Sequence, residues 1–170
     1  FFNFSRKDCE KRAVELARKR DFIKDKDKKH IIELSNKLIT AEYRSLTSIQ
    51  NLKYCLSHGI GFHHAGILPK AKELVELLFS EGLIKVLYAT ETFAVGIKMP
   101  AKTVCFASLL KYDGVNTRYL NSKEYFQLAG RAGRRGIDKI GNAIAVIDNN
   151  NLDLERIKKE EEKEREKLQK

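Results

Sequence analysis

The sequence predicts an α/β fold in which a doubly wound, mostly parallel sheet carries helices on both faces. Short apolar runs typical of buried strands alternate along the chain with longer stretches of helical periodicity. Such an alternation needs crossover connections, and these join parallel strands of one sheet. Hydrophobic residues make up 42% of the 170 residues, which is enough to bury a core and argues against a disordered chain.

The first half of the chain contributes one strand and three helices to this prediction. The apolar residues 1–5 predict a strand, and residues 8–20 predict a helix with one small, apolar face. Lysine, arginine and aspartate dominate residues 18–30, which we interpret as a solvated helix end or connector, with RNA contact as the alternative. Two further helices are expected at residues 31–38 and 46–58.

The second half of the chain alternates more regularly. Strands are expected at residues 60–64, 85–89, 103–108 and 143–147. Pro69 begins a helix between the first two of these strands, because proline suits the first helical position, and Gly82 marks the end of that helix. Ser122 is expected to cap a last helix, which leads into a loop rich in glycine and arginine.

The composition indicates an anionic partner. The formal net charge is +10 and the isoelectric point is near 9.5, a balance that points to nucleic acid or a nucleotide. No apolar stretch approaches the ~18 residues that a membrane span requires, so we expect no membrane partner. We expect an intracellular location, which would be the cytoplasm in a prokaryote and the nucleus or cytoplasm in a eukaryote.

Cysteine and histidine give no indication of a metal site. Cys9, Cys55 and Cys105 lie far apart in the sequence and form no CxxC or Cys/His cluster, so neither a zinc site nor a disulfide framework is expected. His63 and His64 are adjacent, so in a strand their side chains face opposite sides and cannot both bind one metal ion. We therefore expect the three cysteines to be reduced, as in an intracellular protein, and no metal ion to be bound.

We expect one domain over residues 1–150 and a charged tail over residues 151–170. Lysine, arginine and glutamate dominate the tail, a composition typical of a solvent-exposed helix or of a linker to a further domain. The chain opens directly on an apolar, strand-like stretch with no signal peptide before it, as expected for a segment of a larger protein.

Four loops carry the chemically informative residues. In open parallel sheets, ligands bind beyond the carboxyl ends of the strands, where the connecting loops gather. Loops at residues 5–8, 63–69, 90–100 and 127–136 are therefore expected to meet at one rim of the sheet.

The loop over residues 127–136 reads QLAGRAGRRG. Arg131 and Arg134 stand three residues apart among glycines, so both can point the same way with little obstruction. Guanidinium groups match phosphate oxygens in geometry and stay charged at any physiological pH. Placed against a γ-phosphate they would act as arginine fingers, and the alternative is a basic patch for RNA backbone or nuclear import.

Two other loops carry hydroxyl groups directly after a strand. Thr90 and Thr92 offer hydroxyls and backbone amides where a helix would begin, which makes an anion site, with ordinary helix capping as the alternative. Ser5 and Arg6 follow the first predicted strand and offer a second phosphate site. Alternatively, Ser5 only caps a helix.

Three stretches together resemble the second RecA-like domain of superfamily-two helicases, and most closely that of the Ski-two-like DExH RNA helicases, which feed RNA to exosome-type decay. FSRKDCE is similar to helicase motif four. GIGFHHAGILPKAKELVELLFSEGLIKVLYATETFAVGIKMPAKTV covers motifs four-a and five, and QLAGRAGRRGID is similar to motif six. The resemblance extends over roughly residues 1–147, with the motifs in the expected order and spacing.

The resemblance implies a RecA-like fold and a role for each matching residue. Three residues would reach the phosphates of ATP across the cleft between two RecA-like domains: Gln127, Arg131 and Arg134. Three glycines would lie near the nucleotide: Gly96, Gly130 and Gly133. The backbone of single-stranded RNA would be held by Ser5, Arg6, His64, Gly66, Thr90 and Thr92.

The sequence departs from the family pattern in two respects. Lys98 stands where the family usually has asparagine, which leaves the local nucleotide or loop contact open. No GxxxxGK[ST] phosphate loop and no DExH box occur in the 170 residues. We therefore expect ATP and Mg²⁺ to be held by the first RecA-like domain of the same protein, with single-stranded RNA and an exosome-type assembly as further partners. The alternatives are a DNA helicase and a nucleic-acid-binding module without hydrolysis.

Overall fold

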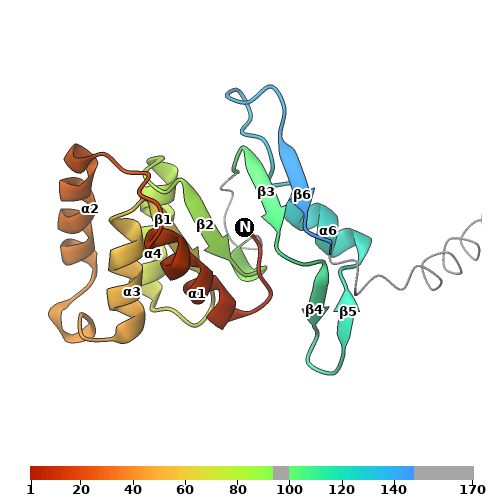
Figure 1. The fold of residues 1–170 in the computed structure, drawn as a ribbon, viewed down its shortest axis with the longest axis horizontal. Coiled ribbons are helices and arrows are strands. Elements are labelled where there is room, and N and C mark those ends of the chain that lie inside the picture. The colour runs from red at the N-terminus through yellow and green to blue at the C-terminus, as the bar shows by residue number, and fades with distance from the viewer. Residues whose placement is uncertain (94–99, 148–170) are drawn as a thin grey trace, which may run out of the picture.

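Residues 1–93 and 100–147 are described by the computed structural model, in which helices and strands alternate as predicted (Figure 1). The helices are α1 (Arg6–Ala17), α2 (Asp25–Leu38), the short 3-10 helix η1 (Ala41–Tyr43), α3 (Thr47–Leu56), α4 (Pro69–Ser80) and α6 (Ser122–Ala129). The strands are β1 (Ile60–His63), β2 (Val86–Ala89), β3 (Thr103–Phe106), β4 (Leu110–Tyr112), β5 (Thr117–Tyr119) and β6 (Asn142–Ala145). Within these two described ranges, no helix is both long and apolar enough to cross a membrane.

The parallel sheet is joined in its middle by the amino-terminal segment. β1 pairs with β2 and β3 pairs with β6, both in parallel. Phe2 connects the two pairs through parallel bridges to Ala89 of β2 and Phe106 of β3. Its N–H donates to the Cys105 carbonyl at 2.7 Å, and its own carbonyl accepts from the Ala107 N–H at 3.0 Å. The order β1–β2–Phe2–β3–β6 is that of a parallel sheet and confirms the predicted class of fold.

Helices cover both faces of the sheet at β1. Neighbouring side chains of a strand point to opposite faces. The His63 ring lies against Glu76 of α4, whereas the His64 ring lies against Glu10 of α1. α4 and α1 therefore cover opposite faces, with α3 packed beside α1, and α2 contacts both α3 and α4 (Figure 1).

The core follows from the apolar spacing of the helices. On α4, Leu74, Val75 and Leu78 are buried, because positions i, i+1 and i+4 lie on one side of a helix. Fully burying one such side chain contributes roughly 1.5–3 kcal/mol. Tyr125 of α6 stacks on Phe106 of β3 with the ring centroids 5.1 Å apart, which ties α6 to the sheet.

Two predicted elements of the first half differ in their bounds. The strand expected over residues 1–5 is reduced to one residue, Phe2, with its two parallel bridges. Ser5 Oγ accepts a hydrogen bond from the Asp8 N–H at 3.2 Å and caps α1, so the chain leaves the sheet before it forms a longer strand. α2 begins at Asp25, earlier than expected, since acidic residues in a first turn stabilise the amino terminus of a helix. The charged connector is therefore shorter than predicted.

The sequence analysis missed the antiparallel hairpin formed by β4 and β5. Asp113 Oδ1 accepts hydrogen bonds from the N–H groups of Val115 and Asn116, at 3.0 and 2.9 Å. Gly114 supplies the positive φ of +104° that the turn requires. An Asp-Gly pair between two short strands was the signal that identifies this turn.

The cap of α6 is Asn121 and not Ser122, which was the predicted cap. Asn121 Oδ1 accepts from the Glu124 N–H at 2.9 Å, and Glu124 Oε2 accepts from the Asn121 N–H, also at 2.9 Å. This reciprocal pair is a capping box, and it fixes where the last described helix begins.

Candidate functional site

The candidate site residues lie at two edges of the sheet. The loops that begin near Ser5, His64 and Thr90 follow the carboxyl ends of their sheet segments and share one edge. The loop between α6 and β6 (residues 130–141), called the arginine loop below, lies at the other edge, since Ala132 bridges Ala101 just before β3 begins. The expectation that all four loops meet at one rim is therefore wrong. The reason is that α6 returns the chain to the amino end of β6 before the loop begins (Figure 1).

Two glycines close the arginine loop at its base. Gly133 has a φ of +88°, and its N–H donates to the Ala101 carbonyl at 2.7 Å. A Cβ atom at Gly141 would lie 2.5 Å from the carbonyl carbon of Ala132 and 2.5 Å from the nitrogen of Gly133. Because only glycine permits this approach, residues 133–141 project from the sheet as a closed loop.

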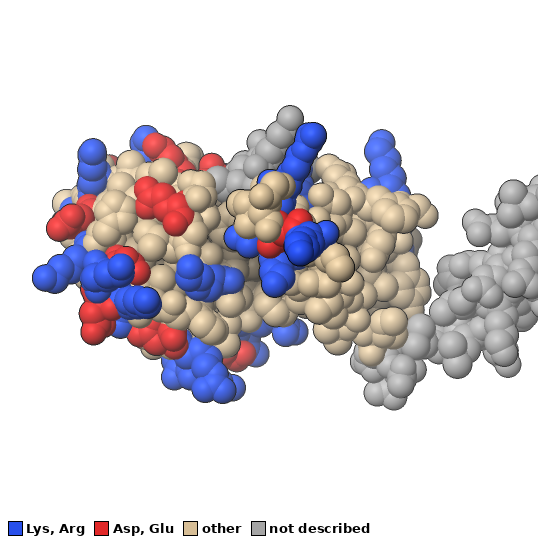
Figure 2. Space-filling view, turned by 90° about the horizontal axis from the view of Figure 1, so that it is seen from above, with Lys and Arg blue, Asp and Glu red and all other residues tan. Residues whose placement is uncertain are grey.

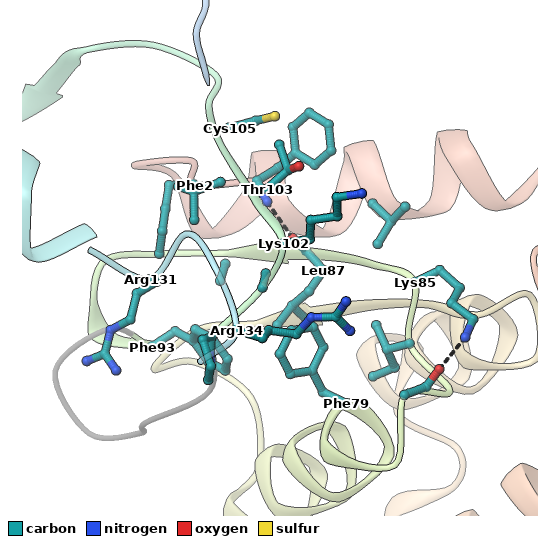
Figure 3. Close-up of a pocket in the computed structure, with 18 residues that line it drawn as sticks. Phe2, Phe79, Lys85, Leu87, Phe93, Lys102, Thr103, Cys105, Arg131 and Arg134 are labelled. Carbon is teal, nitrogen blue, oxygen red and sulfur yellow. Dashed lines mark hydrogen bonds between the residues drawn. The ribbon is translucent and has the colours of Figure 1, made fainter. Parts of the chain in front are cut away.

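A cavity of about 470 Å³ opens beside this loop (Figure 3). Most of its lining is apolar and includes the aromatic rings of Phe2, Phe79 and Phe93. Four cationic side chains also line it: Lys85, Lys102, Arg131 and Arg134. The cavity therefore joins an apolar floor to a concentration of positive charge, and the positive charge attracts anionic groups.

The two arginines point in different directions (Figure 3). Arg134 is engaged by Asp138: its Nε donates to Oδ2 at 2.7 Å and its Nη2 to Oδ1 at 2.9 Å. The guanidinium beside it lowers the pKa of the Asp138 carboxyl to about 2. Both members of the pair therefore stay charged throughout the physiological pH range.

Other predicted residues of the nucleotide side lie around this loop. Gln127 is on the exposed side of α6, outside the described lining of the cavity. Gly130 ends α6, and a Cβ atom there would lie 2.8 Å from the Phe126 carbonyl oxygen. The residues that the structure brings together are Arg131, Gly133 and Arg134. Gly96 and Lys98 lie outside the described residues.

The charge distribution is uneven on this side of the molecule. Figure 2 shows the molecule from above, toward the edge where the arginine loop projects. In this view lysine and arginine side chains stand in the middle and also over the left half, where acidic side chains lie among them, whereas the right-hand part next to the grey residues shows few charges.

Arg6, the residue after Ser5, meets the turn at Gly66 on the carboxyl edge. Ser5 uses its oxygen as the α1 cap, and its hydroxyl hydrogen has no acceptor among the described residues. A Cβ atom at Gly66 would lie 3.4 Å from Cδ of Arg6 and 3.2 Å from Nδ1 of His64. The arginine stem thus lies along the turn, with its charged end exposed beside it.

His64 holds the turn from inside the protein. The Gly66 N–H donates to its Nδ1 at 3.1 Å, so Nδ1 is unprotonated and Nε2 carries the hydrogen that is donated to Glu10 Oε1 at 3.0 Å. The side chain is only 3% exposed. The ring therefore fixes the backbone at Gly66, and Ala65 and Gly66 themselves are exposed.

His63 positions the start of the loop after β2. Its Nε2 lies 2.8 Å from Glu76 Oε1, and its ring meets the edge of the Phe93 ring with the centroids 4.9 Å apart. The Thr90 N–H donates to the His63 carbonyl at 3.1 Å. Thr90 Oγ1 and Thr92 Oγ1 share a hydrogen bond of 2.9 Å, which leaves one hydroxyl hydrogen of the pair to donate to a ligand.

We expect the chain to lose stability as the pH falls from 7.5 to 5.5. Burial lowers the pKa of both His63 and His64, and Glu76 and Glu10 act in the opposite direction. Below pH ~6.5 the unfolded histidines therefore bind more protons than the folded ones. The free energy of unfolding should fall by up to about 1.4 kcal/mol per pH unit for each histidine. Urea unfolding at several pH values measures this, and His64→Gln should reduce the slope; an unchanged slope would contradict the assignment.

The hairpin supplies charged residues that the sequence analysis missed. Arg118 donates from Nη1 and Nη2 to the two carboxylate oxygens of Glu124, both at 2.8 Å. Lys111 Nζ lies 2.9 Å from Glu124 and 2.8 Å from Glu91. These pairs hold the hairpin against α6 and against the loop after β2.

A second cavity, of about 240 Å³, lies between this hairpin and the amino end of α1. Its polar lining consists of Asn3, Ser5, Asp8, Arg12, Ser108, Lys111, Tyr112 and Thr117. The side chain of Arg12 makes no hydrogen bond or ion pair with another described residue and so can meet a ligand. Its i, i+4 spacing from Asp8 was the available signal, since both face the same side of α1.

Comparison with known proteins shows to which family this chain is similar. The family model of the helicase conserved C-terminal domain matches residues 15–136. The exosome RNA helicase MTR4 of Mus musculus is 49% identical over 150 residues, which are 86% of this chain and 14% of the relative. The DExH-box ATP-dependent RNA helicase DExH10 of Arabidopsis thaliana is also 49% identical, over 86% of this chain and 15% of the relative.

A third relative is the antiviral helicase SKI2 of Saccharomyces cerevisiae. It is 46% identical over 156 residues, which cover 90% of this chain and 12% of the relative. The chain thus spans only 12–15% of the length of these three relatives.

Proposed function

Since the chain belongs to the family of helicase conserved C-terminal domains, we propose that it is the second RecA-like half of an ATP-dependent RNA helicase. In this proposal it supplies Arg131 and Arg134 to ATP and one side of a groove for single-stranded RNA. The observation that carries the proposal is the separation of the two groups of loops. The arginine loop projects at the amino edge of β3, whereas the hydroxyl-bearing loops lie at the carboxyl edge.

The amino edge has the character of a phosphate site completed by another domain. Arg131, Arg134, Lys85 and Lys102 supply cations beside one cavity. Among the described residues, no group of three His, Cys, Asp or Glu could hold a metal ion. We assign Mg²⁺ and the phosphate loop to a preceding RecA-like domain, where Mg²⁺ would neutralise phosphate charge. The residues of this chain then act by placing guanidinium charge against the transferring phosphate.

The carboxyl edge suits the backbone of a single strand. Ser5 and the Thr90–Thr92 pair have hydroxyl hydrogens to donate, Arg6 adds an exposed charge, and the turn at Gly66 exposes backbone. Such contacts go to phosphate and sugar and carry no base specificity. Two of the three relatives are named RNA helicases, which favours RNA over DNA, and one is named an exosome helicase. We therefore propose that the protein has an exosome-type assembly as a partner. We also propose an intracellular location.

We expect the 170-residue chain to bind single-stranded RNA weakly, without sequence preference and with a strong dependence on salt. Each phosphate contact to a single strand contributes about 0.7 to the slope of log affinity against log salt, because binding releases counterions. Arg6→Ala should therefore reduce the slope by about 0.7. Fluorescence anisotropy with a labelled oligonucleotide at several salt concentrations measures this.

Arg20→Ala is the matched control, since Arg20 is exposed beyond the far end of α1. It should leave the slope unchanged. Tight, salt-tolerant and sequence-selective binding by the chain alone would instead identify a recognition module and would remove the helicase proposal.

A further inference from the structure

Asp138 holds Arg134 by one edge of its guanidinium group. The carboxylate accepts from Nε at 2.7 Å and from Nη2 at 2.9 Å, and it also accepts from the backbone N–H of Arg134 at 3.0 Å. The aspartate side chain is 7% exposed, whereas the arginine side chain is 43% exposed. The anchor of the pair is thus buried and the group that it anchors remains accessible.

The geometry of the pair leaves the arginine able to bind a phosphate. A guanidinium group has five N–H donors, of which Asp138 takes the one on Nε and one on Nη2. Both hydrogens of Nη1 and the second hydrogen of Nη2 remain. One hydrogen of Nη1 and the remaining hydrogen of Nη2 point in parallel from the end of the group, where they match two oxygens of one phosphate.

The loop around the pair restricts the arginine further. The N–H groups of Ile137 and Asp138 both donate to the Arg134 carbonyl, at 3.0 and 2.9 Å, so residues 134–138 form one closed turn. One carboxylate therefore fixes the backbone and the side chain of the same residue. An arginine held in this way loses less conformational freedom when it meets its ligand.

We propose that Asp138 is a positioning residue, which presents the free end of Arg134 to the transferring phosphate of ATP. The inference rests on the proposed function, because it assumes that Arg134 is an arginine finger. A purely structural role is the competing explanation. The loop does not need Asp138 to close, since Gly133 and Gly141 already close it through backbone contacts that do not involve Asp138.

The test uses the full-length protein and steady-state ATP hydrolysis with saturating RNA. Asp138→Asn should lower kcat by on the order of 10- to 100-fold, as loss of a supporting hydrogen-bond partner does at other sites, and should change KM for ATP much less. Asp138→Glu keeps the charge and both oxygens, so it should recover part of the loss. Lys139→Ala, an exposed neighbour, is the control and should behave as the wild type.

The double variant separates positioning from structure. If Asp138 acts through Arg134, adding Asp138→Asn to Arg134→Ala should lower kcat no further. A further loss of similar size, or an unchanged or raised kcat in Asp138→Asn alone, overturns the inference and leaves the finger in place. An Arg134→Ala variant with nearly full activity would instead remove the finger, and with it the role of Asp138.

Discussion

Arg134→Ala in the full-length protein is expected to lower RNA-stimulated ATP hydrolysis by on the order of 10³-fold or more, the range found for arginine fingers. Arg134 lines the cationic cavity, and its guanidinium keeps an unpaired end. Removal of that charge leaves the developing negative charge on the phosphate without its partner. Arg131→Ala should be nearly as damaging, because Arg131 lines the same cavity.

Arg135→Ala is the matched control for this prediction. Arg135 is the next residue of the same loop, is exposed, and does not line the described cavity. It should retain most of the activity. Steady-state hydrolysis by Arg134→Ala within tenfold of the wild type would favour the basic-patch interpretation of the loop over the finger.

Gly141→Ala is expected to displace the whole arginine loop. Its Cβ would overlap backbone atoms of Ala132 and Gly133 at 2.5 Å, and backbone cannot move aside as a flexible side chain can. Forced overlap of this kind costs on the order of 3 kcal/mol of stability. A shift of about 1 Å at catalytic groups costs roughly 10²-fold in rate, so hydrolysis should fall by about that factor.

Gly136→Ala distinguishes overlap from backbone strain. Gly136 has a φ of +79° but open space around its Cα, so alanine there meets no atom within 4 Å. It should cost only about 1 kcal/mol and leave most of the activity. Thermal unfolding and ATP hydrolysis measured on both variants test this, and equal behaviour of the two would contradict the close approach at Gly141.

The fold class was predictable because each strand of the sheet is a short apolar run between helices. β1 and β2 are buried almost throughout, and their sequences differ clearly from the amphipathic α4 between them. The hairpin was missed because β4 and β5 have three residues each and are mostly polar or exposed. Their position depends on ion pairs to Glu124, which local sequence patterns do not show.

The site was predictable in its residue types and only partly in its geometry. Arg131 and Arg134 could be identified from the sequence because arginines that alternate with glycines form an unusual stretch of exposed, positively charged loop. The edge of the sheet at which they stand depends on the path of α6 and on the bridge between Ala101 and Ala132, which form only in the folded chain. The contact between Asp138 and Arg134 also forms only in the folded chain, because the two residues belong to a loop and not to a helix.

Hydrolysis of ATP by the 170-residue chain and by the full-length protein, compared in one assay with Mg²⁺ and RNA, tests the central proposal most directly. The chain carries no GxxxxGK[ST] loop and no DExH box, so its arginines have no assembled phosphate to stabilise. We expect turnover by the full-length protein and none by the chain above an Arg134→Ala control. Turnover by the chain alone that Arg134→Ala abolishes would show a complete active site within these residues and would contradict the proposal that they form half of one.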